Sequence, residues 1–439
     1  MSGQRAGNTS AEVVRGWIRS LGIDCGPTES ETDGDCAALA WAASGAMAMT
    51  GFGEGPPVLS PAPAFGLLTE VARAFGAVTE LIGERVEPDP AAVLSRRVEG
   101  DGRARRGQRS AGGSSRLLRA ANGWCAVTLS RADDIDAVPA IVGDAGGSDP
   151  WEALEAAAAR WPAAHLAERG QLLGVPAAAL PAVLRRRVPW RGSRIAEPVA
   201  GRSLGDCVVV DLSSLWAGPL CARLLGRAGA RIIKVESVHR PDAARATPEF
   251  FDHLHAGHEF VSVDFRSEQG RRDLGALIDA ADIVIEASRP RALDQLGLGL
   301  DARPHRPGQV WLSITGYGRD HPMRVAFGDD AAVAGGLVGY HRGEPVFCAD
   351  AAGDPLSGIC AALAAATAVA AGGGVLLDLS MRDTAAAFAT APALPHGPHR
   401  VIPHGPDGWA VACDHLNRTQ QVLPQPLSLP TAPAAGDLG

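Results

Sequence analysis

Short apolar runs alternate with helix-like stretches between residues 207 and 390, and this alternation limits the possible folds more than any other feature. The runs include "CVVVDL" (207–212), "RIIKVE" (231–236) and "DIVIEA" (282–287). Buried strands separated by helices are typical of βαβ units in a parallel sheet. We therefore predict a large, doubly wound, Rossmann-like α/β domain over residues 205–390.

The composition argues against several classes of partner. The net charge is −8, and Lys234 is the sole lysine. Because no basic stripe with interleaved aromatic residues is present, we expect no nucleic acid partner. No GxGxxG motif follows the first strand, which gives no support to a bound dinucleotide. The eight cysteines include no CxxC pair. This spacing argues against a zinc site and against a disulfide scaffold. We therefore expect no bound metal, and we expect free thiols in a cytoplasmic protein.

The remaining chain divides by composition. We predict a smaller α+β domain at 116–188, placed N-terminally to the large domain, and an extended tail at 391–439. The Arg- and Gly-rich segment 89–115 and the segment 189–206 are expected to be exposed linkers. Long apolar runs at 36–53 and 359–377 are rich in alanine and glycine. We expect them to be buried helices, with no membrane contact.

A weak internal repeat links the two ends of the chain. Residues 41–66 overlay 329–354 without gaps, and 122–127 ("NGWCAV") echoes 407–412 ("DGWAVA"). Chance similarity in an alanine-rich chain is the alternative explanation. If the repeat is real, residues 1–88 are a degenerate half-copy of an active-site segment.

Several blocks in the second half resemble the family III CoA-transferases, which include formyl-CoA transferase, carnitine CoA-transferase and α-methylacyl-CoA racemase. The blocks occur in the family's order: "VVVDLSSLWAGPLCARLLGRAGARIIKVE" (208–236), "ADIVIEASRPRALDQLGLG" (281–299), "FGDDAAVAGGLVG" (327–339) and "GDPLSG" (353–358). Segments 122–143 and 151–180 are similar to the family's small domain, which normally follows the active-site segment. Their position here implies permuted or partly duplicated modules. The resemblance also implies a homodimer, interlocked as in the family.

Asp354 precedes a proline and an apolar run, a pattern that favours an N-cap followed by a first-turn proline. The resemblance implies a second role, because the family's catalytic aspartate falls on Asp354. Its carboxylate would attack an acyl-CoA thioester, and returning thiolate would give an aspartyl-CoA thioester that an incoming acid resolves. We expect the helix N-terminus to keep Asp354 ionised at neutral pH.

The racemase branch pairs a histidine with this aspartate in a GHD motif, which here reads Gly328, Asp329, Asp330. Two-way proton transfer needs a base on each face of the α-carbon. Loss of the histidine counts against racemisation, although Asp329 could replace it. The alternative for Asp329 and Asp330 is a solvated acidic turn.

The resemblance also implies a coenzyme A site, with CoA or acyl-CoA as substrate and no permanently bound cofactor. The candidate residues are Trp216, Ala217, Gly218, Arg245, His258 and Arg289. For Trp216 the alternative is core packing, and for the arginines an ordinary surface position. His258 and Glu259 replace a basic pair of the family, which weakens the expected phosphate contact.

We therefore predict an enzyme that moves CoA between carboxylic acids through Asp354. Two alternatives stay open: an acyl-CoA racemase or isomerase that uses Asp354 and Asp329, and a non-catalytic partner subunit that binds CoA. No cluster of residues identifies the acyl group.

Overall fold

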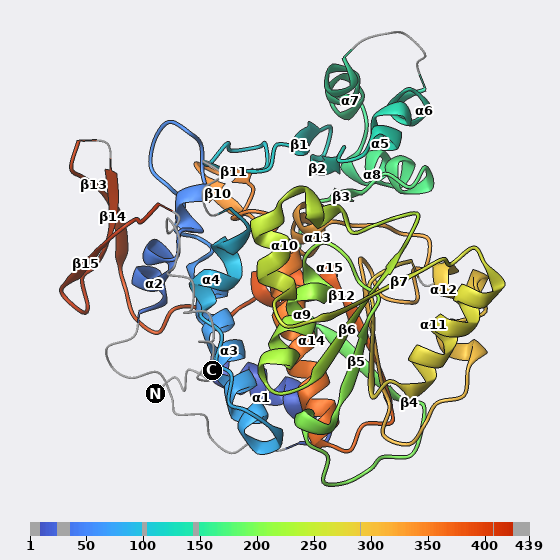
Figure 1. Cartoon of the computed structure of the whole chain (residues 1–439). Coiled ribbons are helices and arrows are strands. Elements are labelled where there is room, and N and C mark those ends of the chain that lie inside the picture. The colour runs from blue at the N-terminus through green and yellow to red at the C-terminus, as the bar shows by residue number, and fades with distance from the viewer. Residues whose placement is uncertain are drawn as a thin grey trace, which may run out of the picture.

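A seven-stranded sheet forms the centre of the molecule. The computed structural model describes residues 9–23, 36–98, 103–143, 149–289, 291–406 and 408–424. In spatial order the strands are β4 (Trp190–Arg194), β12 (Val375–Ser380), β9 (Val310–Thr315), β8 (Ile283–Glu286), β5 (Val208–Asp211), β6 (Arg231–Ser237) and β7 (Glu259–Val263) (Figure 1). Neighbouring strands run parallel, except that β4 is antiparallel to β12.

Each face of this sheet buries a different core. Val209 packs into the core that contains α9 (Ala217–Arg227) and α14 (Gly353–Ala370), whereas Val210 packs into the core of α11 (Glu268–Ala280). Successive side chains of a strand point to opposite faces, so a run of valines serves both cores. The predicted α/β class with a parallel sheet is therefore confirmed.

The strand order reverses beside β5, the first strand of the parallel set. The chain continues from β5 outward to β6 and β7, and then returns to β8 on the other side of β5. In open parallel sheets such a reversal leaves a crevice at the carboxyl ends of the strands, where ligands bind. Here these ends are followed by the loop before α9 and by the segment after Glu286.

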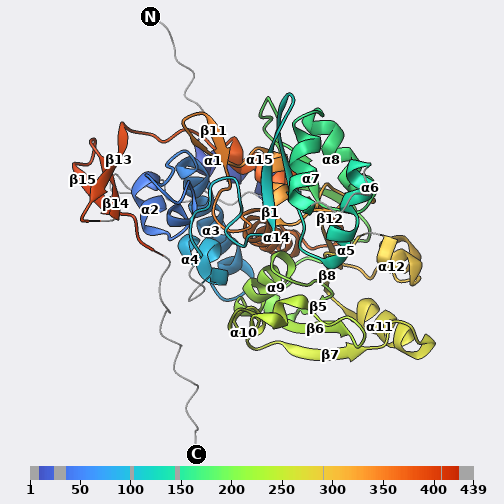
Figure 2. The same ribbon diagram turned by 90° about the horizontal axis from the view of Figure 1, so that it is seen from above.

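Helix α14 lies at the centre of the packing, between α9 and α3 (Ala62–Ile82) (Figure 2). Among the described residues it is the one helix long and apolar enough to cross a membrane, and 89% of its length is buried within the protein. Small side chains allow this close packing. A Cβ atom at Gly358 would lie 2.7 Å from the carbonyl oxygen of Ala217 and 3.0 Å from the Cβ of Leu220.

We expect Gly358→Ala to destabilise the protein by about 1–3 kcal/mol, because α9 and α14 must move apart to admit the methyl group. Urea unfolding measures this change. Gly16→Ala, in α1 (Ser10–Arg19), is the matched control, since a Cβ there meets nothing within 4 Å. Alanine is the better helix former at an open site and should stabilise by roughly 0.5–1 kcal/mol. Equal effects at both positions would contradict the close-packing argument.

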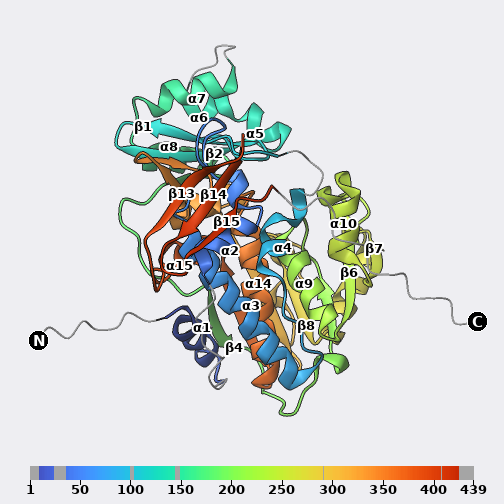
Figure 3. The ribbon, with the colours of Figure 1, turned by 90° about the vertical axis from the view of Figure 1, so that its left-hand side faces the viewer.

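Two small antiparallel sheets each pack against a helix from the other half of the chain. The front sheet consists of β1 (Ser115–Ala120), β2 (Gly123–Thr128) and β3 (Ala177–Ala179). It contacts α13 (Gly328–Gly335). The back sheet consists of β13 (His399–His404), β14 (Gly408–Cys413) and β15 (Arg418–Gln421). It contacts α2 (Ala37–Ala43), as Figure 3 shows.

A separate core lies beneath the front sheet. It contains residues from Leu118 to Ala177. Its helices are α5 (Ala132–Asp136), α6 (Val138–Val142), α7 (Pro150–Ala158) and α8 (Ala163–Leu172). Further helices and strands of the molecule are α4 (Pro90–Ser95), α10 (Pro248–His255), α12 (Arg291–Gln295), α15 (Met381–Ala389), β10 (Gly339–His341) and β11 (Glu344–Val346).

Three segments differ from expectation. The tail predicted at 391–439 is not simply extended, because it forms the back sheet over 399–421; residues 425–439 lie outside the described part of the chain. Segment 189–206 contains β4, and 89–115 contains α4, with 99–102 outside the description. These elements were missed because they are short and pack against distant partners, as β4 does against β12 and the back sheet does against α2. A segment of four to six residues is too short for its hydrophobic period to identify it.

The two segments of the proposed repeat form similar elements. Overlaid without gaps, α3 and α14 end at corresponding residues, Ile82 and Ala370. Strand β2 likewise corresponds to β14 over its full length. Gly66, which overlays Asp354, is buried, and a Cβ there would lie 3.1 Å from that of Ala37. Common descent of the two segments stays a prediction.

Candidate active site

Asp354 lies inside the first turn of α14 rather than at its cap. The helix begins at Gly353, its N-cap is Ala352, and no side chain caps it. The expected N-cap role of Asp354 is therefore wrong. The chain reaches this turn through a distorted loop, in which Ala349 (φ 56°) and Ala351 (φ 45°) are left-handed. Residues other than glycine rarely adopt this conformation, and such strain concentrates at functional sites.

Gly328 lies against the carboxylate of Asp354. A Cβ at Gly328 would be 2.5 Å from Oδ2 of Asp354 and 2.2 Å from the carbonyl oxygen of Ala351. Only glycine fits this approach. The first turns of α13 and α14 therefore meet, and the backbone of Gly328 hydrogen bonds with Asp354.

The surroundings raise the pKa of Asp354 to about 7, chiefly by burial. Asp329 and Asp350 raise it further, whereas Arg97 and the Gly328 backbone lower it. Burial disfavours the charged form because the carboxylate loses water that few dipoles replace. The expectation that Asp354 is held ionised at neutral pH is therefore wrong: both protonation states are populated there.

Asp329 and Asp330 are buried on α13 and are not a solvated turn. Oδ1 of Asp329 accepts from the Ala351 amide at 3.0 Å, and Oδ2 accepts from Ser115 Oγ at 2.8 Å. Oδ1 of Asp330 accepts from Thr128 Oγ1 at 3.2 Å, and burial raises the pKa of both aspartates. The two acids thus attach the front sheet to α13.

Arg97 and Arg103 hold a further buried acid, Asp350, which is 1% exposed. The guanidinium nitrogens lie 3.3 Å (Arg97) and 3.0 Å (Arg103) from its carboxylate. The Arg97 guanidinium also lies 5.3 Å from the ring centroid of Trp216, a cation–π distance. Arg97 therefore connects the Asp354 turn with the loop at the end of β5. Sequence reasoning missed both arginines because they belong to the supposed linker.

Trp216 is a core residue at the start of α9. It is 2% exposed and contacts Phe250 edge to face, with ring centroids 5.4 Å apart. Ala217 and Gly218 already form the first turn of α9, rather than a loop before it. A Cβ at Gly218 would lie 2.1 Å from Ser213 Oγ, so glycine is required for the loop to close. This burial leaves the Trp216 ring no open face for an adenine.

Two of the predicted CoA residues offer no free positive charge. Arg245 donates to Glu236 through Nε at 3.1 Å and Nη2 at 2.5 Å. His258 faces His255, with their Nδ1 atoms 3.2 Å apart, and burial lowers the pKa of His258 to about 4. An imidazole with this pKa is neutral at pH 7. Neither residue is brought to Asp354.

Arg289 is different, because it lies among other cations. Arg131, Arg240 and Arg291 are close enough to lower its pKa, after burial as the largest cause. Neither Arg240 nor Arg289 forms an ion pair with a described residue. These arginines follow β6 and β8, at the carboxyl edge of the sheet. Unneutralised guanidinium groups at this edge form a patch suited to phosphate.

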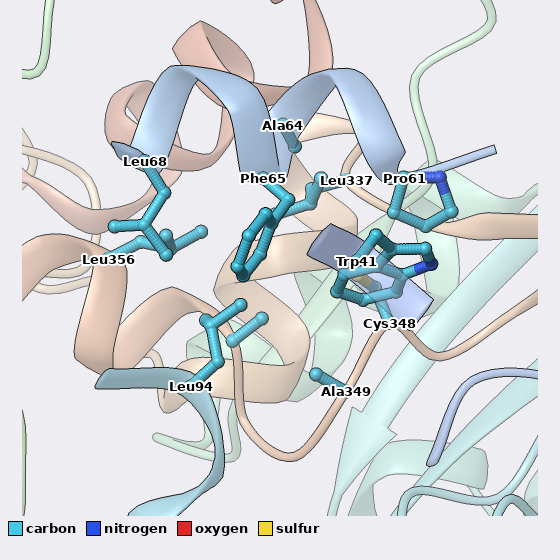
Figure 4. A pocket seen from close by; sticks show the side chains of 11 residues that line it. Trp41, Pro61, Ala64, Phe65, Leu68, Leu94, Leu337, Cys348, Ala349 and Leu356 are labelled. Atoms are coloured by element: carbon cyan, nitrogen blue, oxygen red, sulfur yellow. The ribbon is translucent and has the colours of Figure 1, made fainter. Parts of the chain in front are cut away.

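A small apolar cavity lies between α3 and the first turn of α14 (Figure 4). Phe65, Leu68, Ala352 and Leu356 line it. Ala352 and Leu356 lie four residues apart and share one face of the helix, whereas Asp354 projects from the opposite side. The cavity therefore belongs to the helix interface and not to the carboxylate.

Residues 204–422 match the family described as CoA-transferase family III. This half of the chain belongs to CoA-transferase family III. The family III segment includes β5 to β15 and, with them, Asp354, Asp329 and Arg289. Arg97, Ser115 and Thr128 come from the half that precedes it.

Curated proteins similar to this chain include CoA-transferases. A succinyl-CoA–D-citramalate CoA-transferase from Chloroflexus aurantiacus is 30% identical over 185 residues, 38% of this chain and 45% of that protein. A protein named acyl-CoA transferase from Fusarium pseudograminearum is 31% identical over 160 residues, 31% of this chain and 35% of its own length. The crystal structure of a CAIB/BAIF family protein from Brucella suis is 25% identical, with a TM-score of 0.42, covering 48% of this chain and 65% of that one. The chain spans about a third to a half of the curated relatives it matches.

Proposed function

We propose that this protein transfers CoA between carboxylic acids through a covalent intermediate on Asp354. The observation that carries the proposal is the placement of this carboxylate. It lies half-buried on the first turn of a long helix, beside Gly328 and Arg97, in a segment that belongs to a family of CoA-transferases. The names of several relatives support CoA transfer between acids.

In the proposed reaction an Asp354 oxygen attacks the thioester carbonyl of the donor acyl-CoA. A C–O bond forms, the C–S bond breaks, and CoA leaves as thiolate. The thiolate then attacks the Asp354 carbonyl carbon of the mixed anhydride, expels the donor carboxylate and leaves an aspartyl-CoA thioester. The acceptor carboxylate attacks this thioester in the same way. Thiolate finally attacks the new acyl group, which gives the product acyl-CoA and frees Asp354.

The environment of Asp354 suits a group that must be both nucleophile and leaving group. Its partial desolvation makes the carboxylate more reactive than one in water, whereas Arg97 limits the rise of its pKa. The backbone of Gly328 hydrogen bonds with Asp354, and the N-terminus of a helix such as α14 favours developing negative charge. The arginine patch at Arg240 and Arg289 would hold the phosphates of CoA at the carboxyl edge of the sheet.

The contacts of Asp329 favour CoA transfer over racemisation. Both of its carboxylate oxygens accept hydrogen bonds, from Ala351 and from Ser115. A base on the opposite face of a substrate would need one oxygen directed at the α-carbon proton. Asp329 instead positions the loop that leads to Asp354.

Intact-protein mass spectrometry tests the proposal on the full chain incubated with acyl-CoAs, including succinyl-CoA, with and without hydroxylamine or borohydride. An adduct that maps to Asp354 and is absent in Asp354→Ala would support CoA transfer and identify the donor. Deuterium exchange at the α-carbon without an adduct would support the racemase. CoA binding with neither signal would support a non-catalytic subunit.

We expect Arg97→Gln to move the acid limb of the pH–rate profile to higher pH. Arg97 is a positive charge that lowers the pKa of Asp354, so its loss leaves more of the carboxyl group protonated. Since a close opposite charge commonly changes a pKa by one unit or more, activity at pH 6 should fall up to about tenfold relative to pH 9. Arg109→Gln, an exposed arginine nearby, is the control. An equal loss at all pH values would instead assign Arg97 a structural role.

A further inference from the structure

Four potential metal ligands meet where the back sheet contacts α2. Cys36, His396, His399 and Cys413 each offer one ligand atom, and these four atoms lie within 4.8 Å of one another. Cys36 directly precedes α2, and His399 and Cys413 are paired residues across the β13–β14 hairpin. Cys36 is separated from His399 by 363 positions in the sequence, so two distant parts of the chain converge on one point.

One buried polar atom of this cluster has no partner among the described residues, whereas the Cys36 sulfur has backbone hydrogen bonds from Ala38 and Leu39. Nε2 of His396 is buried and has no hydrogen bond in the described part of the chain. The Cys36 sulfur has Nε2 of His399 at 3.2 Å, and both cysteines are buried, 7% and 1% exposed. Buried polar groups are normally hydrogen bonded, so an unpaired imidazole nitrogen beside two thiols needs an explanation. A cation between the four atoms would satisfy all of them.

The donor set selects the ion. Two thiolates and two imidazoles are the ligands of closed, tetrahedral, structural zinc sites, and hard cations such as Mg²⁺ and Ca²⁺ prefer oxygen. Bond lengths of about 2.0–2.3 Å place tetrahedral ligand atoms roughly 3.3–3.8 Å apart. The widest pair therefore needs to close by about 1 Å, which side-chain rotation can provide.

The front sheet shows what such a site would do. There, Ser115 and Thr128 are paired across the β1–β2 hairpin and hydrogen bond to Asp329 and Asp330 on α13. His399 and Cys413 occupy the corresponding hairpin pair of the back sheet and face Cys36 at the start of α2. The front sheet is thus joined to α13 by hydrogen bonds, and the back sheet places potential metal ligands at the corresponding hairpin pair, beside α2.

We propose that Cys36, His396, His399 and Cys413 bind one Zn²⁺ ion that fastens the back sheet to the N-terminal half of the chain. Binding replaces two thiol protons, which are released, and leaves all four coordination positions filled by protein. The site is structural, because no position remains for water or substrate. It lies at the junction of α2 and the back sheet, whereas Asp354 lies at the junction of α13 and α14, so the proposal does not depend on the proposed function.

Sequence spacing gave the opposite expectation, since no two cysteines form a CxxC pair. That rule applies to ligands supplied by one local loop. Here the fold assembles them. One cysteine comes from each half of the chain, and the two histidines, three residues apart, come from the segment that was predicted to be an extended tail. The signal that could have found the site is His396-x-x-His399 followed by Cys413.

The test is the zinc content of the reduced, full-length chain after dialysis against zinc-free buffer, measured by mass spectrometry of the metal. We expect about one zinc per chain, and close to none in Cys413→Ser or His399→Ala. Cobalt replacement should give the visible bands of a tetrahedral site and a sulfur-to-cobalt charge-transfer band. His404 is an exposed histidine on β13, the strand that also contains His399, and His404→Ala should keep the metal.

Three results would overturn the proposal. The wild-type chain could take up neither zinc nor cobalt; Cys413→Ser could keep a full equivalent of zinc; or the non-reduced chain could contain a Cys36–Cys413 disulfide that the metal does not displace. If Cys413→Ser fails to fold, chelation of the wild-type protein replaces it. Chelation should then lower the melting temperature, and added zinc should restore it.

Discussion

Asp354→Asn is expected to reduce turnover by at least about 10³-fold and to abolish the covalent adduct, because an amide cannot form the acyl anhydride or the aspartyl-CoA thioester. The change keeps the size of the side chain and its contact with Gly328. The loss should therefore appear in kcat, with little change in the affinity for CoA measured by calorimetry. Steady-state assays with the donor identified by mass spectrometry provide the rate.

Two variants separate this chemistry from general damage. Asp354→Glu keeps the carboxylate but makes the side chain one methylene longer. The space beside Gly328 is already narrow, since a Cβ on Gly328 would lie 2.5 Å from Oδ2 of Asp354. We therefore expect a loss of turnover nearly as large as in Asp354→Asn. Asp273→Asn, an exposed aspartate on α11, should leave the rate unchanged. A rate in Asp354→Asn within tenfold of wild type would remove Asp354 from the mechanism.

Asp354→Asn is also expected to stabilise the protein at pH 8. Burial raises the pKa of Asp354 from its ordinary value of 3.8 to about 7. Between these pH values the folded protein therefore binds more protons at this site than the unfolded chain, and stability falls as pH rises. Asparagine carries no charge and avoids this cost, so the variant should gain up to about 4 kcal/mol at pH 8, and less where water reaches the carboxylate.

Urea unfolding of both proteins from pH 4 to pH 8 measures this difference. The gain should be near zero at pH 4, grow through pH 7 and then level off. Asp329 raises the pKa of Asp354, so its own titration changes when Asp354 is replaced; the same comparison in an Asp329→Asn background separates the two effects. A constant difference, or a variant that is less stable at pH 8, would show that Asp354 is not held in a desolvated position. Higher stability with lower activity is the trade-off typical of an active-site residue.

The central sheet was predictable from sequence because its strands bury side chains on both faces. Strands Val208–Asp211 and Ile283–Glu286 each consist of a short apolar run that ends in an acidic residue, and local pattern suffices for such segments. The elements that were missed depend on distant partners. Strand β4 is recruited by β12, and the back sheet packs on α2, which lies hundreds of residues earlier. Short-range periodicity contains no information about these contacts.

The residues of the candidate active site were likewise predictable only in part. Asp354 and Asp329 came from a motif, and the structure places them at adjoining helix starts. Arg97, Arg103 and Asp350 carry no local signal, because an Arg-rich, Gly-rich segment is normally solvated. The protonation state of Asp354 was also wrong, because a helix N-terminus favours ionisation whereas burial opposes it more strongly. Only the full set of neighbours decides between these two effects.

Each small sheet packs against a helix from the other half of the chain. This arrangement also determines when the protein can finish folding on the ribosome. Leu39 and Trp41 of α2 emerge early, but the back sheet that contacts this helix ends at Gln421. At typical synthesis rates the delay is on the order of 20–80 s. During this time an apolar helix face is available to chaperones and to other nascent chains. Fragments that end before residue 421 should therefore aggregate, and slower translation should lower the yield of soluble protein.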